Sequence, residues 1–274
     1  MFHKNKNNPF KYYDPRSLGC YGNLKVPNNI IIPTTDEGAW EYFDKHRWVY
    51  NKIEITLSQG MNCAPMGLSP KKFPVFMKPI CNLHGAGVGS RILQSKEDYE
   101  KNMRLSGYFW MEYLDGEHLS HDLILANDEI VYLITFKGRS LGDGMFDYWE
   151  TVETPDNILE YIKSWIEKNL RGYTGCVNIE TIKNKIIECH LRMGDIDRLG
   201  NLQLMQNIVN VYSGKKWDFH EDLPKFYLFA LWGDWNVKYK IDKSIADGIC
   251  KDLTCYQIDK PELYFQNPQG GVRV

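Results

Sequence analysis

The chain has 274 residues, of which 43% are hydrophobic and 25% are charged, and its formal net charge is −2. These values are ordinary for a folded protein, and the length suffices for one large or two modest domains. A net charge this small argues against broad electrostatic binding to nucleic acid or to an anionic membrane surface.

Targeting and redox features also restrict the class of protein. The sequence shows no apolar run near the roughly 18 residues of a membrane span, and no secretory signal pattern opens it. Its seven cysteines are odd in number and lack CxxC spacing, so reduced thiols fit best. We therefore expect a cytoplasmic protein with no nucleic-acid or membrane partner.

The first expected elements are short. Residues 1 to about 29 are polar and rich in Asn, Lys, Pro and Gly, which is typical of irregular structure. Thr35 and Asp36 offer caps for a helix that runs to about Lys45. A second helix is expected over residues 51–60, ended by a glycine.

A lysine and a glycine-rich loop follow. An apolar strand is expected over residues 73–79, ending in Lys78-Pro79, and the loop after it contains Gly85, Gly87 and Gly89. Backbone amides of such a loop can converge on a phosphate without interference from Cβ atoms, and the lysine supplies a positive charge. The glycine pattern alone is a weak signal, because glycine-rich turns are common.

The remaining elements alternate between helical and strand periodicity. Helices are expected at residues 96–105, 155–169, 202–212, 223–235 and 243–253, and strands at 108–114, 118–125 and 130–137. The last two strands flank Ala126-Asn127-Asp128-Glu129, a hairpin signature.

A second predicted hairpin, at residues 175–194, carries acidic side chains. If Lys183-Asn184-Lys185 forms the turn, Glu180 lies opposite Glu188, with Cβ atoms about 4.5–5.5 Å apart. His190 follows Glu188 at a step of two and shares its face. Two facing carboxylates and a histidine are explained by a divalent cation such as Mg²⁺ or Mn²⁺ between them. The alternative is a solvent-facing edge with its charges splayed into water.

The order of these pieces resembles the ATP-grasp superfamily from about Asp44 to about Gly194. The resemblance implies that Lys52 and Lys78 contact phosphates and that the glycine loop closes over them. It implies a nucleotide site formed by Lys52, Lys78, Gly85, Gly87, Gly89, Ser90, the hinge residues Glu112, Tyr113 and Leu114, and the ribose-binding Glu117. The family's metal ligands match Glu180, Glu188 and His190.

The resemblance also implies an α+β, ATP-grasp fold in which two α+β lobes sandwich the nucleotide. Residues 1–45 would form a short N-terminal segment, a reduced form of the region that precedes the nucleotide fold in many members. The small lobe with the glycine loop would span 46–114, and the large lobe with the metal site 115–212. Residues 213–274 would form a helical C-terminal extension and tail.

The implied activity is that of an ATP-dependent ligase. It would join a carboxylate to an amine, or to a thiol, through an acylphosphate and release ADP, with ATP and Mg²⁺ or Mn²⁺ as cofactors. The expected substrates are a small molecule or peptide with a carboxylate and an amine acceptor. Lys78, Arg139 and Arg192 are the expected catalytic residues, the arginines holding the carboxylate or the acylphosphate. A kinase and a non-catalytic nucleotide-binding module are the alternatives.

His190 departs from the family pattern, which places Asn between the Glu and the Arg at steps of two. Imidazole nitrogen suits Mn²⁺ better than Mg²⁺. His190 therefore either binds the metal or serves in substrate binding or proton transfer. His118 and His121 face opposite sides of their predicted strand, so they are not expected to share a metal.

Overall fold

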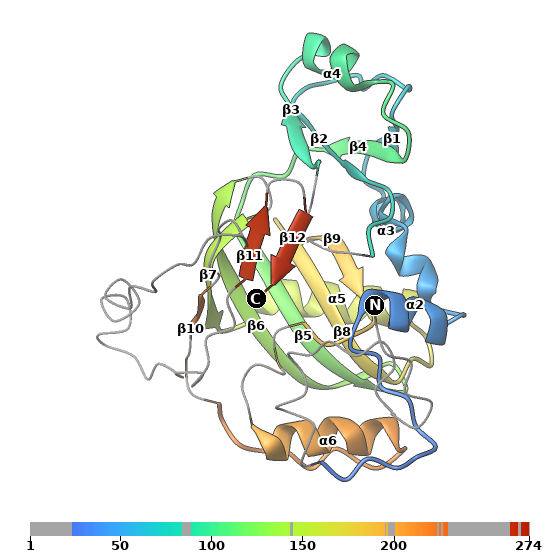
Figure 1. Ribbon diagram of the computed structural model, residues 1–274, viewed down its shortest axis with the longest axis vertical. Helices are drawn as coiled ribbons and strands as arrows, with labels where there is room; N and C mark the ends of the chain where they lie inside the picture. Colours follow the sequence, from blue (N-terminus) through green and yellow to red (C-terminus); the bar gives the residue numbers. More distant parts are fainter. Residues whose placement is uncertain are drawn as a thin grey trace.

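Two antiparallel sheets organise the chain (Figure 1). The computed structural model describes residues 24–83, 89–142, 145–194, 196, 201–223, 225, 227–229, 264–267 and 270–273. The helices are α2 (Asp36–Tyr42), the 3-10 helix η2 (Arg47–Tyr50), α3 (Lys52–Ser58), α4 (Lys96–Asn102), α5 (Asp156–Asn169) and α6 (Leu202–Tyr212). The strands are β1 (Cys63–Pro65), β2 (Val75–Pro79), β3 (Arg91–Leu93), β4 (Tyr108–Glu112), β5 (His118–Ala126), β6 (Glu129–Gly142), β7 (Met145–Val152), β8 (Gly175–Ile182), β9 (Lys185–His190), β10 (Tyr227–Phe229), β11 (Tyr264–Asn267) and β12 (Gly270–Arg273).

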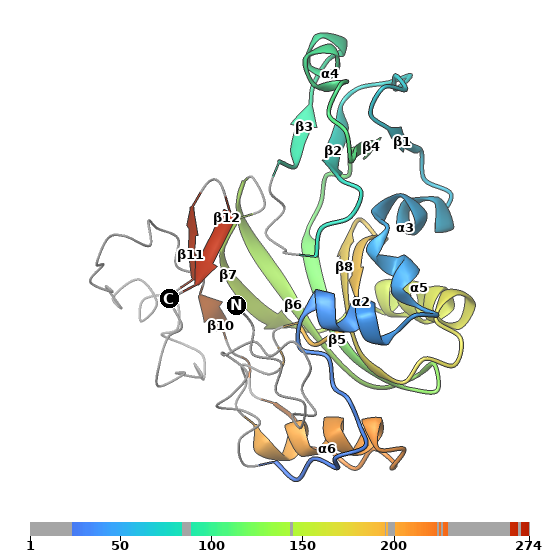
Figure 2. The same cartoon turned by 45° about the vertical axis from the view of Figure 1, so that its right-hand side comes forward.

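The small lobe is a four-stranded sheet of order β1-β4-β2-β3 with α4 against it. Alternation along β2 directs Val75 and Met77 into its core, where they meet Leu93 and Trp110. Tyr99 of α4 completes this cluster. Figure 2 shows the small lobe standing beyond one end of the large sheet, with α3 between them. The small lobe is narrow because this buried cluster is small.

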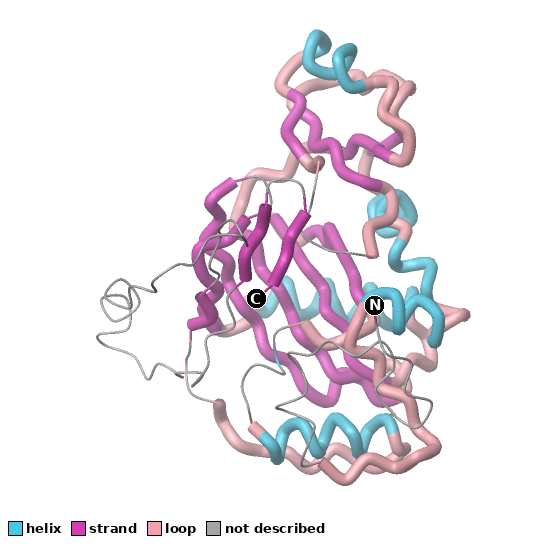
Figure 3. Tube along the Cα trace, viewed as in Figure 1, coloured by secondary structure: helices cyan, strands magenta, loops and turns pink. Residues whose placement is uncertain are grey.

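The large lobe is a six-stranded sheet of order β10-β7-β6-β5-β8-β9, and each of its faces carries an apolar cluster. On one face α5 inserts Ile158, Ile162 and Trp165, whose helical spacing forms a single stripe. On the other face α6 packs through residues that include Leu204 and Ile208. In Figure 3 these strands form a continuous block, with α6 along its lower end.

Two tight turns set the strand pairing of the large sheet. Asn127 and Asp128 join β5 to β6 with φ of 53° and 62°, as type I′ hairpins require, so the predicted turn is confirmed. The β8–β9 turn has two residues, Lys183 and Asn184, with φ of 50° and 58°. The expected three-residue turn is therefore wrong, because the primed two-residue turn matches the twist of the strands.

The segments outside the two lobes agree less well with the sequence predictions. The first helix exists but ends at Tyr42 rather than near Lys45, and the helix at 202–212 matches α6. A helix over 223–235 is wrong at Tyr227–Phe229, which pairs with β7 as an edge strand. The helix expected at 243–253 lies outside the described residues. In the described part of the expected helical extension beyond Tyr212, the regular elements are β10 and the β11–β12 hairpin.

One expected domain boundary lies between the two lobes. The expected division after residue 114 falls in the link between the end of β4 at Glu112 and the start of β5 at His118.

Among the described residues, no helix is long and apolar enough to cross a membrane.

Candidate functional site

Glu180 and Glu188 face each other across β8 and β9, as the sequence predicted. His190 lies beside them, and one ligand atom from each of the three residues falls within 4.8 Å of the others. The His190 side chain is 5% exposed, whereas the two carboxylates are 22% and 20% exposed. The two carboxylates are therefore partly accessible to solvent, whereas His190 is not.

A bulge in β9 produces this alignment. Thr181 pairs with Ile186, but Glu180 pairs with Glu188, so Ile187 is the extra residue. With a two-residue turn and no bulge, Glu180 would oppose Ile187, and Glu188 would point to the other face of the sheet. The bulge also offers the Ile187 carbonyl oxygen to Lys78, whose Nζ donates to it at 2.6 Å.

Two lysines reach the carboxylates from the small-lobe side. Lys52 begins α3, where Asn51 caps the helix, and its Nζ lies 2.5 Å from Glu188 Oε1. Lys78 comes from β2, and its Nζ lies 5.9 Å from the centre of the Phe109 ring. Both lysines are 5% exposed, which is unusual for this residue type. The structure thus brings together the two lysines and the three ligand candidates that the sequence singled out.

The electrostatics of this cluster reflect its mixed charge. Burial alone would raise the pKa of Glu188, but the charges of Lys52, His190 and Lys78 hold it at about 2. Burial opposes the shift at Glu180 as well, yet its hydrogen bond to His118 and the charge of that residue lower its pKa. Burial and the neighbouring Lys52 lower the pKa of Lys78 to about 8. Both carboxylates are therefore anionic at neutral pH.

His118 supports Glu180 from the neighbouring strand. Its Nε2 lies 2.7 Å from Glu180 Oε2, and its ring contacts Phe146 and Trp149 edge to face. These two aromatic rings lie over Gly138, where a Cβ would come within 2.6 Å of Phe146 and 2.8 Å of Trp149. The sequence analysis considered His118 only as a metal partner of His121 and missed this supporting position.

His121 lies on the face of β5 opposite to His118, as the sequence predicted. It is fully buried, and its ring nitrogens lie 2.8 Å from Thr135 Oγ1 and 2.9 Å from Thr181 Oγ1. His121 therefore belongs to the core.

Asp36 of α2 joins the group from the far end of the sequence. Its Oδ1 lies 3.0 Å from His190 Nδ1, and its two oxygens accept from Nε and Nη2 of Arg192 at 2.9 and 3.0 Å. The charges of Arg192 and His190 overcome burial and hold the pKa of Asp36 well below its usual range. The sequence analysis identified Asp36 only as a helix cap, because nothing local signals a contact 154 residues away.

The two expected catalytic arginines occupy different settings. Both edges of the Arg192 fork are engaged, by Asp36 and by the Met193 carbonyl at 2.9 Å. Arg192 therefore pairs with Asp36, and its expected role at the carboxylate or acylphosphate stays a prediction. Arg139 is exposed on β6, with its guanidinium carbon 5.7 Å from the centre of the Tyr148 ring.

The expected nucleotide contacts lie along the link between the lobes. Glu112 ends β4 and donates its backbone N–H to the Asn62 carbonyl oxygen. Tyr113 is exposed, and Leu114 packs against the apolar cluster that contains Phe109 and Met111 of β4. Glu117 is exposed and pairs with Lys137 of β6. Of the glycine loop, Gly89 and Ser90 are described, and Gly89 has a φ of 81° that favours glycine. Gly85 and Gly87 lie outside the described residues.

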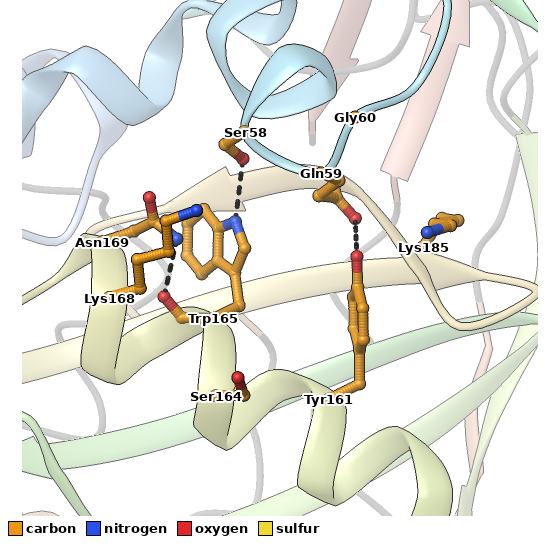
Figure 4. A pocket seen from close by; sticks show the side chains of 9 residues that line it. All are labelled: Ser58, Gln59, Gly60, Tyr161, Ser164, Trp165, Lys168, Asn169 and Lys185. Atoms are coloured by element: carbon orange, nitrogen blue, oxygen red, sulfur yellow. Dashed lines mark hydrogen bonds between the residues drawn. The ribbon is translucent and has the colours of Figure 1, made fainter.

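A pocket of about 420 Å³ lies on the opposite side of the large sheet (Figure 4). Ile179, next to Glu180 in β8, packs into the α5 cluster, so Glu180 points away from this side. In the pocket Tyr161 donates to Gln59 at 2.8 Å and Trp165 donates to Ser58 at 2.9 Å. These bonds join α5 to the end of α3, which gives the pocket a structural explanation.

The residues around Glu180 fit a divalent cation. Two carboxylates and one imidazole are a donor set that suits Mn²⁺ and, through the oxygens, Mg²⁺. A metal-bound histidine usually donates its second nitrogen to a carboxylate, and His190 faces Asp36 in this way. The arrangement thus resembles a metal site with its supporting partners in place.

Comparisons with known proteins agree with this geometry at the level of fold. No protein-family model and no curated protein sequence matches the chain. Among solved structures, a phosphoribosylamine–glycine ligase from Thermotoga maritima superposes with a TM-score of 0.55 at 18% identity, covering 73% of this chain and 65% of that one.

Two further structures are similar. N5-carboxyaminoimidazole synthetase from Staphylococcus aureus, complexed with ADP, gives a TM-score of 0.58 at 12% identity, covering 73% and 65% of the two chains. N5-carboxyaminoimidazole ribonucleotide synthetase from Thermus thermophilus gives 0.55 at 12%, covering 75% and 68%. The chain spans less than two thirds of the length of the first two of these structures. At such identities the similarity establishes architecture, and the chain therefore has the ATP-grasp fold.

Proposed function

We propose that the protein is an ATP-dependent ligase that joins a carboxylate to an amine, or to a thiol, with release of ADP and phosphate. One observation carries the proposal. Two buried lysines from the small-lobe side lie beside the two carboxylates and the imidazole of the large sheet: Lys52 pairs with Glu188, and Lys78 binds the neighbouring Ile187 carbonyl. Such a mixed cluster suits a metal–phosphate group, in which anionic oxygens and a cation are held together.

The triphosphate would lie against this cluster. In the structure Lys52 is paired with Glu188 and Lys78 with the Ile187 carbonyl. Both ammonium groups would exchange these partners for phosphate oxygens, with little movement of their buried stems. A bound Mg²⁺ or Mn²⁺, held by Glu180, Glu188 and His190, would neutralise phosphate charge there. The protein's own contribution is to position and stabilise charge, as in other phosphoryl transfers.

The base and ribose would lie along the link between the lobes. The end of β4 places Glu112, Tyr113 and Leu114 between the two sheets, and Glu117 follows just before β5. In the proposed complex Glu117 contacts the ribose, and Gly89 and Ser90 flank the phosphates. ATP would thus lie between the lobes.

The reaction follows in two steps. A substrate carboxylate attacks the γ-phosphorus, and ADP leaves to give an acylphosphate. An amine then attacks the acyl carbon, loses a proton and expels phosphate. Arg139 is our candidate for holding the substrate carboxylate or acylphosphate, because a guanidinium fork matches either group and this side chain is exposed on β6. The substrates belong to the class of small carboxylic acids or peptides and amines.

The solved structures with this fold support the proposal. The three described above are a ligase and two synthetases by name, and one of them is complexed with ADP. The Lys52–Glu188 ion pair favours a second candidate, a nucleotide-binding module without turnover, because it already neutralises part of the site.

The test is ADP release from ATP in the presence of Mg²⁺ or Mn²⁺ and pooled amino acids, short peptides and nucleotides. A ligase requires both an acid and an amine, a kinase requires one acceptor, and a binding module releases no ADP. Lys78→Met is the matched control, since it keeps an apolar stem of similar length and removes only the ammonium group. ADP release that is unchanged in this variant would contradict the proposal.

A further inference from the structure

Asp36 ties the N-terminal helix to the ligand group of the large sheet. It begins α2, where Thr35 accepts from Gly38 as the cap, and its carboxylate is almost fully buried. Oδ1 lies 3.0 Å from Nδ1 of His190, and both side chains are only 5% exposed. A buried carboxylate needs partners, and Asp36 finds them on β9 and just after it.

The contact with Asp36 decides which ring nitrogen of His190 is available. An anionic carboxylate accepts, so Nδ1 carries the hydrogen of that bond, and Nε2 is the ring nitrogen left to bind a cation, which would displace any proton held there. Nε2 lies 3.4 Å from Glu188 Oε1, on the side where Glu180 also lies. Nε2 therefore lies on the side of the ring where the two carboxylates converge.

We propose that Asp36 is a positioning residue of the metal site, whose carboxylate holds His190 so that Nε2 ligates the divalent cation beside Glu180 and Glu188. The inference rests on the metal site of the proposed function, and it adds a residue from outside both lobes. It also decides between the two roles left open for His190, in favour of metal ligation.

Arg192 has a defined part in this arrangement. Its Nε and Nη2 grip the two oxygens of Asp36 at 2.9 and 3.0 Å, which fixes the plane of the carboxylate. Oδ1 is then shared between Arg192 and His190. The chain of contacts runs from Arg192 through Asp36 to His190, so the segment around α2 completes the site.

Mn²⁺ binding tests the proposal without relying on turnover. Electron paramagnetic resonance of free Mn²⁺ gives the dissociation constant, with and without a non-hydrolysable ATP analogue. Asp36→Asn should weaken Mn²⁺ binding by about 10- to 100-fold, as loss of such supporting partners does at other metal sites. Asp122→Asn is the comparison variant, because Asp122 is equally buried on the same face of the sheet but accepts from Asn178 and from the backbone of Gly194 and Ile196 rather than from His190.

Two further measurements separate positioning from general stability. Electron spin echo modulation of bound Mn²⁺ should show a ¹⁴N signal in the wild-type protein and none in His190→Asn. In the His190→Asn background, Asp36→Asn should weaken Mn²⁺ binding no further, because Asp36 acts through His190. The wild-type ¹⁴N signal tests the metal role of His190 even if Asp36→Asn does not fold.

Several results would overturn the inference. They are equal Mn²⁺ affinity in the wild type and Asp36→Asn, equal weakening by Asp36→Asn and Asp122→Asn, or wild-type Mn²⁺ without a ¹⁴N signal. Failure to bind Mn²⁺ with or without the nucleotide analogue would overturn both this inference and the metal site of the proposed function. Binding with a ¹⁴N signal and Asp36 dependence, but no effect of nucleotide, would support Asp36 and count against the ligase.

Discussion

Lys52 Nζ lies 2.5 Å from Glu188 Oε1, and this ion pair connects the start of α3 to the large sheet. The lysine side chain is 6% exposed and the glutamate side chain 20% exposed. A lysine so deeply buried requires an anion, because an unpaired ammonium group in the protein interior is strongly unfavourable. Glu188 therefore contributes to folding as well as to the candidate site.

Glu188→Ala should lower the free energy of unfolding. Removing one partner of a fully buried pair costs about 3–5 kcal/mol, and the partial exposure of Glu188 reduces our expectation to about 2–3 kcal/mol. Urea denaturation followed by tryptophan fluorescence measures the loss. The double variant Lys52→Met with Glu188→Ala should recover most of it, since no uncompensated charge remains. A Glu188→Ala protein as stable as the wild type would show that the pair is absent in solution.

His121 should make stability depend on pH. Burial, with a smaller effect of His118, lowers the pKa of His121 to about 4 in the folded protein, from 6.5. Between these values the unfolded chain binds more protons, so stability is present at neutral pH and is lost as the pH falls.

The comparison that checks this is between the wild type and His121→Leu. From pH 7 to pH 5 the wild type should lose about 2 kcal/mol more of its unfolding free energy than the variant. Loss of the hydrogen bonds to the Thr135 and Thr181 hydroxyls lowers the stability of the variant at every pH, which leaves the slope unaffected. Equal losses in the two proteins would contradict the expected shift.

Gly138→Ala should destabilise the protein, because a Cβ there meets Phe146 at 2.6 Å and Trp149 at 2.8 Å. We expect a loss of about 1–3 kcal/mol, as in other overpacked sites. Gly116→Ala is the matched control. Its nearest contact is the flexible side chain of Lys183 at 2.9 Å, which can move aside. Thermal unfolding of the two variants measures the difference, and equal midpoints would show that the aromatic rings are not held over Gly138.

The sequence predicted which residues of the acidic hairpin face each other, but it did not predict the turn or the bulge that align them. Glu180 lies opposite Glu188 as predicted, although the turn is one residue shorter than expected. The extra residue Ile187 compensates for the shorter turn. A bulge depends on its surroundings, here on Lys78 binding the Ile187 carbonyl, and no local pattern announces it.

Helices with regular spacing were predicted well from the sequence, whereas contacts between distant residues were not. The sequence predicted α6 with its observed limits, and α3 and α4 to within a few residues. The position of Lys52 at a helix start gave it a role before its contacts were known. Asp36 and His118 were missed as supporting residues because their partners are 154 and 62 residues away. Such contacts arise from the assembled sheet and not from neighbouring residues.

Binding of ATP with Mn²⁺ or Mg²⁺, measured by isothermal titration calorimetry, tests the central claim most directly. In the proposed complex Lys52, Lys78, Glu180, Glu188 and His190 together hold a metal–triphosphate group. We expect metal-dependent binding to the wild type, a raised melting temperature by mass action, and at least tenfold weaker binding to Lys78→Met. No heat of binding and no thermal shift at millimolar ATP with either metal would contradict it.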